Sequence, residues 1–283
     1  MIKEWIESYN PKNREQVNQA LREIMQEIAL AGLQRSGFFE KAAFYGGTAL
    51  RIFHQLDRFS EDLDFSLLES DEHFSLNHYL NGVVDEFAAM GMKVSIVEKI
   101  KTQKTNVDSA FLKSDTLWTE LNLENILPEM HVSGNVSIKI KIEIDTAPPP
   151  GFLTEEKLLL KPFSFYVRCY QLPDLFAGKI HALLFRKWKQ RVKGRDWYDM
   201  EWYIRKGIRL NKTHFIQRAI DSNDLSTNEM SNAEFLELLR AKIESTSINA
   251  IKEDVVRFIG DENKLAIWSK QYFLDLIERI KLD

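Results

Sequence analysis

The chain has 283 residues, of which 38 are Lys or Arg and 42 are Asp or Glu, so its formal net charge is −4. With 44% apolar and 11% aromatic residues it can bury a sizeable core, which excludes a disordered or fibrous protein. The single cysteine, Cys169, cannot form an internal disulfide, and no apolar run approaches the ~18–20 residues that cross a bilayer. We therefore expect a soluble, cytoplasmic protein.

The first segments predict a helix, a short strand and a second helix. Asn13 to Ala31 carries apolar residues at the 3–4 spacing of a helix, and Gly32 is a natural end for it. The run Ala42 to Tyr45 is short and mostly apolar, as in a strand, and Gly46-Gly47 interrupts it. Thr48 to His54 then has helical composition. This order indicates strand, glycine turn and helix.

Strands follow, because polar and apolar residues alternate in several later segments. Asp62 to Leu68 has the period of a half-buried strand, which places the side chains of Asp62 and Asp64 on the same face. Val136 to Asp145 has the cleanest alternation in the chain. The other expected elements are a helix over Asp71 to Met90 and strands over Met92 to Lys101, Leu117 to Leu123 and Phe163 to Tyr170.

The chain changes character in its second half. Pro148-Pro149-Pro150 and Gly151 cannot continue a central strand, so we expect the sheet to loosen there. From Asp174 onward the apolar spacing is helical nearly to the end. We predict an α+β protein, with a mixed-sheet domain over residues 1–160, on which the N-terminal helix packs, and a mainly helical domain over residues 161–283.

Two carboxylates on one strand near a glycine turn indicate phosphate and metal chemistry. On a strand, the Cα atoms of Asp62 and Asp64 lie roughly 6.5–7 Å apart, which suits Mg²⁺ or Mn²⁺ ions that neutralise triphosphate oxygens. Glu143 on a neighbouring strand would complete the carboxylate set. Gly46-Gly47 lets backbone approach phosphate oxygens at the start of a helix that Thr48 could cap. This set favours nucleotidyl transfer from an NTP.

Each part also has a purely structural explanation. An Asp-x-Asp pair commonly decorates a solvated strand face, and Gly-Gly is commonly only a turn. Glu143 lies between Lys141 and Asp145, a row that could form salt bridges across strands. Arg51 and Ser60 are candidate nucleotide-binding residues, although an exposed helix residue and a turn serine account for them equally well. Two carboxylates that point in the same direction repel each other, however, and a bound cation often offsets this repulsion.

These motifs resemble the AbiEii/AbiGii-like toxins, a branch of the polymerase-beta-type nucleotidyltransferase superfamily. The first motif of the family, a Gly-Gly/Ser turn followed by an acidic pair, is similar to Gly46–Arg51 with Arg58–Asp64. Downstream, Lys179–Leu184 and Gly194–Asp199 resemble the lysine and Arg-Asp-x-Tyr-Asp motifs of the family. The resemblance spans roughly residues 40–205.

The resemblance implies roles for particular residues. Asp62 and Asp64 would be metal ligands, Lys179 would reach the phosphates of the nucleotide, and Asp196 would lie in the cleft between domains. The third carboxylate of the superfamily stands in an apolar-acidic-apolar triplet, which fits Glu143, with Asp145 as its substitute. The resemblance also implies the toxin of a toxin–antitoxin or phage-defence system, which modifies RNA such as tRNA, or protein, and has a cognate antitoxin.

A basic stretch between Lys179 and Arg195 supports an RNA acceptor. It holds seven basic residues and no acidic one, and Trp188 and Trp197 interleave it. Lys179 and Arg186 are seven residues apart and therefore share a helical face. A solvated helix end would explain the stretch as well. The alternatives are a nucleotidyltransferase that acts on a small molecule and a non-catalytic NTP- or RNA-binding protein.

Overall fold

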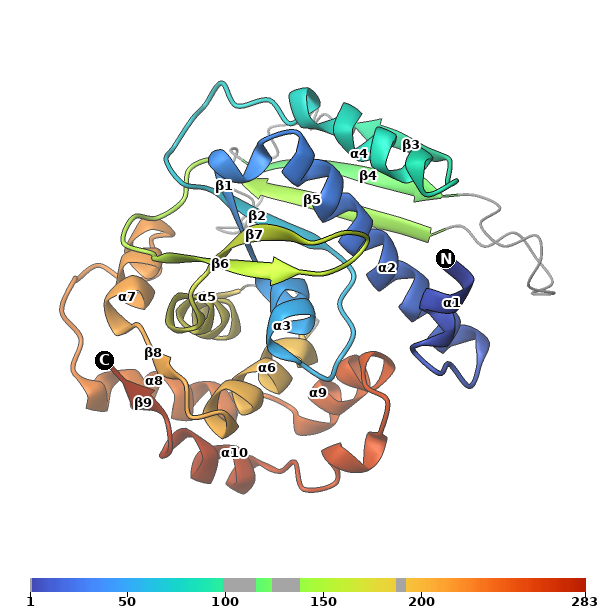
Figure 1. The fold of residues 1–283 in the computed structure, drawn as a ribbon. Helices are drawn as coiled ribbons and strands as arrows, with labels where there is room; N and C mark the ends of the chain where they lie inside the picture. Colours follow the sequence, from blue (N-terminus) through green and yellow to red (C-terminus); the bar gives the residue numbers. More distant parts are fainter. Residues whose placement is uncertain (1, 99–115, 124–137, 187–191) are drawn as a thin grey trace.

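The computed structural model describes residues 2–98, 116–123, 138–186 and 192–283. In this part of the chain seven strands form one sheet, in the order β3-β4-β5-β2-β1-β7-β6 (Figure 1). The strands are β1 (Ala42–Tyr45), β2 (Leu63–Leu67), β3 (Val94–Glu98), β4 (Thr116–Leu123), β5 (Ile138–Asp145), β6 (Thr154–Leu159) and β7 (Phe165–Tyr170). β2 runs parallel to β5 and β1 parallel to β7, whereas the other pairs are antiparallel. The predicted mixed sheet and α+β class are confirmed.

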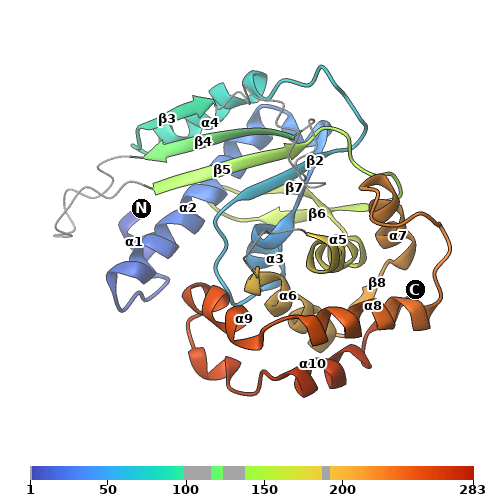
Figure 2. The same ribbon diagram turned by 180° about the vertical axis from the view of Figure 1, so that it is seen from behind.

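Helices cover both faces of the sheet and continue into a helical layer. They are α1 (Ile2–Glu7), α2 (Arg14–Arg35), α3 (Gly46–His54), α4 (Asn77–Ala89), α5 (Leu172–Phe185), α6 (Gly194–Arg205), α7 (Lys212–Asp221), α8 (Asn232–Ser245), α9 (Ile248–Val255) and α10 (Lys270–Ile277). The two-residue strands β8 (Arg209–Leu210) and β9 (Lys281–Leu282) pair near the C-terminus. In Figures 1 and 2, α5 and α6 lie between the sheet and the outer helices α8 to α10.

The two faces of the sheet belong to different hydrophobic clusters because successive strand residues point to opposite sides. Phe44 of β1 packs in a cluster with residues of α2 and α4, such as Ile28 and Phe87. Its neighbour Ala43 packs with α5 and the later helices instead. The sheet is therefore anchored on one side by α2 and α4 and on the other by the helical layer.

Gly32 does not end α2, contrary to the expectation from sequence. The helix begins after Asn13, whose side chain accepts a hydrogen bond from the Gln16 backbone N–H, and continues to Arg35. A Cβ at position 32 would lie 2.5 Å from the Cα of Val83 on α4. The glycine is present because α2 and α4 pack backbone against backbone there, as small residues at helix contacts allow.

The strand predictions agree with the structure within a few residues for β1, β2, β4, β5 and β7. The helix predicted from Asp71 begins later, at Asn77, and the predicted ends at residues 99–101 and 136–137 lie outside the described residues. β6 was not predicted, because its sequence Thr-Glu-Glu-Lys-Leu-Leu has no clear alternation. β6 and β7 extend the sheet to Tyr170, beyond the boundary proposed at residue 160. The division into two domains stays a prediction.

Strand register brings distant sequence motifs together. Tyr45 on β1 lies opposite Asp64 on β2, and Asp64 lies opposite Glu143 on β5. α5 starts directly after β7, which pairs with β1, so the helical layer begins beside the same strands. Within the described ranges, no helix combines the length and apolar character that a membrane span requires.

The close contact between α2 and α4 gives a first prediction. We expect Gly32→Ala to lower the free energy of unfolding by about 1–3 kcal/mol, because the new methyl group overpacks a backbone contact. Gly260→Ala is the matched control, since a Cβ at position 260 would meet no atom within 4 Å. Urea denaturation measures both, and equal stability of the two variants would contradict the close packing.

Candidate functional site

A cavity of about 250 Å³ lies between the sheet and helices α5, α6 and α7. On the sheet side it is lined by a set of acidic and turn residues, namely Tyr45, Gly46, Asp62, Asp64, Glu143 and Asp145. On the helix side it is lined mainly by charged residues, among them Lys179, Arg186, Lys193, Asp196 and Arg218. The cavity thus has an acidic wall from the strands and a largely basic wall from the helices.

Asp64 is the most strongly perturbed carboxylate of the acidic wall. Burial, together with the negative charges of Glu143 and Asp62, raises the pKa of Asp64 to about 7. Burial and Glu143 also raise the pKa of Asp62. Lys193 and Lys179 act in the opposite direction on Asp64 but do not balance these effects. The wall therefore carries more negative charge than its surroundings compensate.

The two glycines make room for side chains of the site. Gly46 has a φ of +83°, and a Cβ there would lie 2.3 Å from an Asp64 carboxylate oxygen, so only glycine fits. At Gly47 a Cβ would lie 2.7 Å from the Arg58 guanidinium and 3.0 Å from the Ser60 hydroxyl. The pair thus brings the start of α3 against the acidic strand and against the loop before it.

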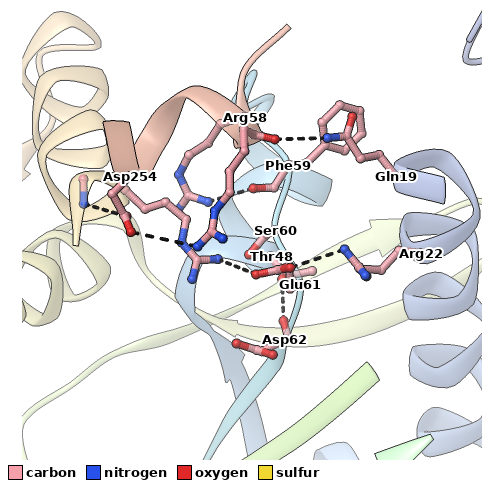
Figure 3. Close-up of polar contacts among 12 residues, drawn as sticks. Gln19, Arg22, Thr48, Arg58, Phe59, Ser60, Glu61, Asp62 and Asp254 are labelled. Atoms are coloured by element: carbon pink, nitrogen blue, oxygen red, sulfur yellow. Dashed lines mark hydrogen bonds and ion pairs between the residues drawn. The ribbon is translucent and has the colours of Figure 1, made fainter. Parts of the chain in front are cut away.

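Thr48 does not cap α3, which corrects the prediction from sequence. The N-cap residue is Tyr45, and its side chain makes no capping bond. The Thr48 hydroxyl instead donates a 2.5 Å hydrogen bond to the backbone carbonyl of Asp62, a contact that Figure 3 shows. Thr48 therefore holds the chain in place immediately before β2.

Arg51 and Ser60, the other candidate nucleotide-binding residues, have neighbours away from the acidic pair. The Arg51 guanidinium pairs with Glu23 of α2 at 2.7 Å and donates to the Leu56 carbonyl. The Ser60 backbone carbonyl accepts a hydrogen bond from Gln26 of α2. Both residues support the loop between α3 and β2, which connects the glycine turn to the acidic strand.

A buried ion pair links this loop to the helical layer. The Arg58 guanidinium donates two hydrogen bonds of 2.6 Å to the two carboxylate oxygens of Asp199 on α6. The two side chains are 2% and 0% exposed. Burial alone would raise the pKa of Asp199, but the charges of Arg58 and Lys179 outweigh it and hold this pKa well below its usual range. Asp199 is therefore ionised at neutral pH.

Lys179 and Asp196, the two helix residues expected in the site, lie at the cavity beside this pair. The Lys179 ammonium is 2.7 Å from Asp199 and 3.7 Å from Asp196. Arg186 follows the last residue of α5 with an extended backbone, so it does not share a helical face with Lys179 as predicted, yet it approaches Asp196 at 3.4 Å. Burial alone would raise the pKa of Asp196, but the charges of Lys193, Arg186 and Lys179 outweigh it and hold this pKa below its usual value. The basic wall is thus organised around two ionised carboxylates.

Further polar contacts fasten the loop from residue 57 to residue 62. Glu61 accepts from Arg22 of α2 at 3.4 Å and from Arg195 of α6 at 3.3 Å, and Figure 3 shows Glu61 facing Arg22. The Tyr198 hydroxyl donates to Asp57 at 2.6 Å. The loop that leads into the acidic pair is therefore held from the α2 side and from the α6 side.

The aspartates of the acidic wall suit a divalent cation in their chemistry, whereas Glu143 has another partner. Mg²⁺ prefers carboxylate oxygen and typically binds one or two carboxylates together with substrate phosphates and water. Asp62 and Asp64 provide that number. Glu143 bonds instead to Lys141, and within the described residues no three His, Cys, Asp or Glu side chains are arranged to hold a metal ion. Of the two alternatives for the third carboxylate, the register places Glu143 next to Asp64 and Asp145 next to Ser66.

Some residues that the sequence analysis named only as parts of a motif make contacts that it did not predict. Arg195 and Asp199 have the spacing of a surface helix pair, yet they contact Glu61 and Arg58 in the loop before β2. Their helix carries buried Trp197 and Met200, a sign that this segment is internal. Lys187–Arg191 of the basic stretch lie outside the described residues.

Comparison with known proteins gives one family. The model of the family "Nucleotidyl transferase AbiEii toxin, Type IV TA system" matches residues 28–275. The structure of JHP933 from Helicobacter pylori is similar, with 16% identity and a TM-score of 0.47 over 92% of this chain and 94% of that one. A proposed nucleotidyltransferase from H. pylori has 17% identity and a TM-score of 0.41 over 90% and 92%. No curated protein matches the chain.

The buried Arg58–Asp199 pair gives a second prediction. We expect Asp199→Asn to lower the free energy of unfolding by about 3–5 kcal/mol at pH 7, because Arg58 and Lys179 lose their buried counter-charge. The low pKa of Asp199 stabilises the native state above the unfolded-state pKa of about 3.9, and this contribution is lost as pH falls below it. The deficit of the variant should therefore shrink below about pH 4.

Glu278→Gln is the matched control for this prediction, because Glu278 forms an ion pair with Arg240 in which both side chains are exposed. Chemical denaturation of both variants between pH 3 and pH 7 makes the comparison. A deficit for Asp199→Asn that is no larger than that of Glu278→Gln, or that does not depend on pH, would contradict the assignment.

Proposed function

The chain belongs to the AbiEii nucleotidyl transferase toxin family, and from this premise we propose that its cavity transfers an NMP from an NTP to an acceptor hydroxyl and releases pyrophosphate. The observation that carries the proposal is the position of Asp64. This half-buried carboxylate touches the glycine turn at the start of α3 and faces a wall of lysine and arginine. A triphosphate and its cation would satisfy both walls of the cavity.

The chain's residues divide between binding and positioning. The backbone at Gly46 opens α3 directly beside Asp64, and the free N–H groups of that helix end favour phosphate oxygens. Lys179 lines the cavity with its ammonium on Asp199, from which it can contact a phosphate without a change of helix position. Asp199 and Arg58 do not reach the reacting atoms in this scheme. They fix the loop that ends in Asp62.

A divalent cation, Mg²⁺ or Mn²⁺, would be held by Asp62 and Asp64. When bound it would neutralise charge on the triphosphate and lower the pKa of the acceptor hydroxyl. Glu143 is the third candidate ligand, and it would have to exchange its bond with Lys141 for this role. The raised pKa of Asp64 supports the assignment, because a buried carboxylate next to like charges is stabilised by a nearby cation.

RNA, with tRNA as one example, is the acceptor class that we favour. Arg186 and Lys193 contribute positive charge at the side of the cavity where α5 ends and α6 begins. Such charge beside a transfer site suits a polyphosphate backbone. Membership of a type IV toxin–antitoxin family also makes a cognate antitoxin the expected partner in the cell.

The third prediction concerns transfer itself. With Mg²⁺ and labelled NTPs, the purified protein should label one pool among total RNA, total protein and small metabolites. Asp64→Asn should reduce this labelling by about 100-fold or more, because a neutral amide is a weaker cation ligand and the loss is several kcal/mol in the transition state.

Asp275→Asn serves as the matched control, since Asp275 is an exposed carboxylate on α10. It should label acceptors like the wild type. Absence of labelling in all three pools with every NTP would favour a binding protein without transferase activity. Labelling of metabolites alone would replace RNA by a small-molecule acceptor.

The fourth prediction concerns binding of the cation, measured independently of catalysis. The affinity for Mn²⁺ should fall about tenfold or more in Asp62→Asn and in Asp64→Asn. It is measured without nucleotide from the decrease of the EPR signal of free Mn²⁺. Glu143→Gln should change it less, because Glu143 bonds to Lys141. Equal Mn²⁺ affinity in the wild type and in both aspartate variants would remove these residues as ligands.

A further inference from the structure

The cavity has a second end, on the α7 side of α5, to which the proposed reaction assigns no role. Lys179 leaves α5 toward Asp199 on α6. The preceding residue, Gly178, faces α7, because a Cβ there would lie 3.8 Å from the Arg218 Nε and 3.9 Å from its Cζ. Successive helix residues point about 100° apart. α5 therefore separates a basic group around Lys179 from the side chain of Arg218.

Arg218 is an arginine without a counter-charge at this second end. Its guanidinium has no hydrogen bond or ion pair within the described ranges, and its Nε is buried without an acceptor. Arg58, Arg186 and Arg195, by contrast, each contact a carboxylate. A buried donor left unsatisfied costs about 1–3 kcal/mol, and more when it is charged. A ligand that accepts hydrogen bonds would remove this cost.

The acidic residues near Arg218 are already engaged with other groups. Asp174 accepts from the Leu153 backbone N–H and from the Asn211 amide, each at 2.7 Å. Asp145 accepts from the Ala147 backbone N–H at 3.1 Å. The ring of Tyr170 stacks on Tyr45 with centroids 5.3 Å apart. The second end thus presents a guanidinium beside aromatic rings, and the nearby carboxylates of Asp145 and Asp174 accept hydrogen bonds from groups other than this guanidinium.

The second end is displaced from the acidic pair along the strands. Asp64 is in register with Glu143, and Ser66 with Asp145, so Asp145 lies about 6.6 Å further along β5. Tyr170, which lines the cavity, donates a buried hydrogen bond from its hydroxyl to the Ser66 hydroxyl at 2.8 Å. A group bound at Arg218 would therefore belong to a substrate that also reaches Asp64, or to a second substrate beside it.

We propose that Arg218 forms a phosphate subsite at the α7 end of the cavity. The proposal rests on the proposed function. A guanidinium presents paired N–H donors in a plane that matches two oxygens of a phosphate, and this match is stronger than that of a lysine. The phosphate comes from the NTP itself or from the backbone of a nucleic-acid acceptor, and binding experiments with both distinguish the two sources.

The test compares Arg218→Ala and Arg218→Lys with Arg279→Ala, an exposed arginine that follows α10. Fluorescence anisotropy measures Kd for a labelled 12-nucleotide single-stranded RNA, and competition against a labelled nucleotide measures Kd for ATP, GTP, CTP and UTP. Ca²⁺ at a fixed concentration replaces the Mg²⁺ of the transfer assay to prevent turnover. Thermal unfolding of each variant checks that it is folded.

We expect Arg218→Ala to weaken the binding of one of these two probe classes about tenfold or more, with partial recovery in Arg218→Lys and no change in Arg279→Ala. An equal loss for all four NTPs identifies the phosphates of the nucleotide. A loss for RNA alone, with a salt-dependence slope reduced by about 0.7, identifies a backbone phosphate of the acceptor.

Three results would overturn the subsite. Unchanged binding of both probe classes in Arg218→Ala would show that the guanidinium contacts no phosphate, while the wild-type binding would leave the proposed function standing. A loss confined to one of the four NTPs would indicate contact with a base. If the wild type itself binds neither NTP nor RNA, the proposed function fails together with the subsite.

Discussion

The geometry of the site depends on the buried contact between Arg58 and Asp199. Arg58 belongs to the loop that leads into the acidic strand, and Asp199 belongs to α6 in the helical layer. Burying two charges costs much of what their attraction returns, so such a pair contributes less to net stability than to a defined orientation. Its two parallel hydrogen bonds fix both the distance and the rotation of the loop relative to α6. Because Lys179 bonds to the same carboxylate, Asp199 of α6 joins both α5 and the loop.

The two glycines follow from the same constraint. The Arg58 guanidinium that bonds to Asp199 lies against the start of α3, so position 47 must lack a Cβ because the guanidinium occupies that space. Position 46 must lack one because Asp64 lies against it. The turn therefore serves two purposes at once. It brings the first helix turn close to the acidic wall, and it lets the buried ion pair form directly behind that turn.

The sequence predicted the strands better than the ends of helices and the partners of charged residues. Alternation located β2 and β5, because one face of each is buried and the period of two is visible. It could not reveal that Gly32 lies in a contact between two helices, since a glycine that ends a helix and a glycine that packs against another helix look the same in the sequence. Thr48 follows a glycine turn like many caps, yet its acceptor is the Asp62 carbonyl, which only the folded loop brings near. Residue spacing carries local periodicity but no distance between segments.

The charges of the cavity explain why the site needs more than its aspartates. The acidic wall raises the pKa of Asp64 through burial and the like charges of Glu143 and Asp62. On the basic wall, burial, with Arg186, Lys179 and Arg195 adding to it, lowers the pKa of Lys193 to about 8, although Asp196 opposes this change. Asp64 on one wall and Lys193 on the other are thus both shifted toward their neutral forms. A triphosphate with its cation carries both signs of charge in the required order, so its binding would relieve both walls together.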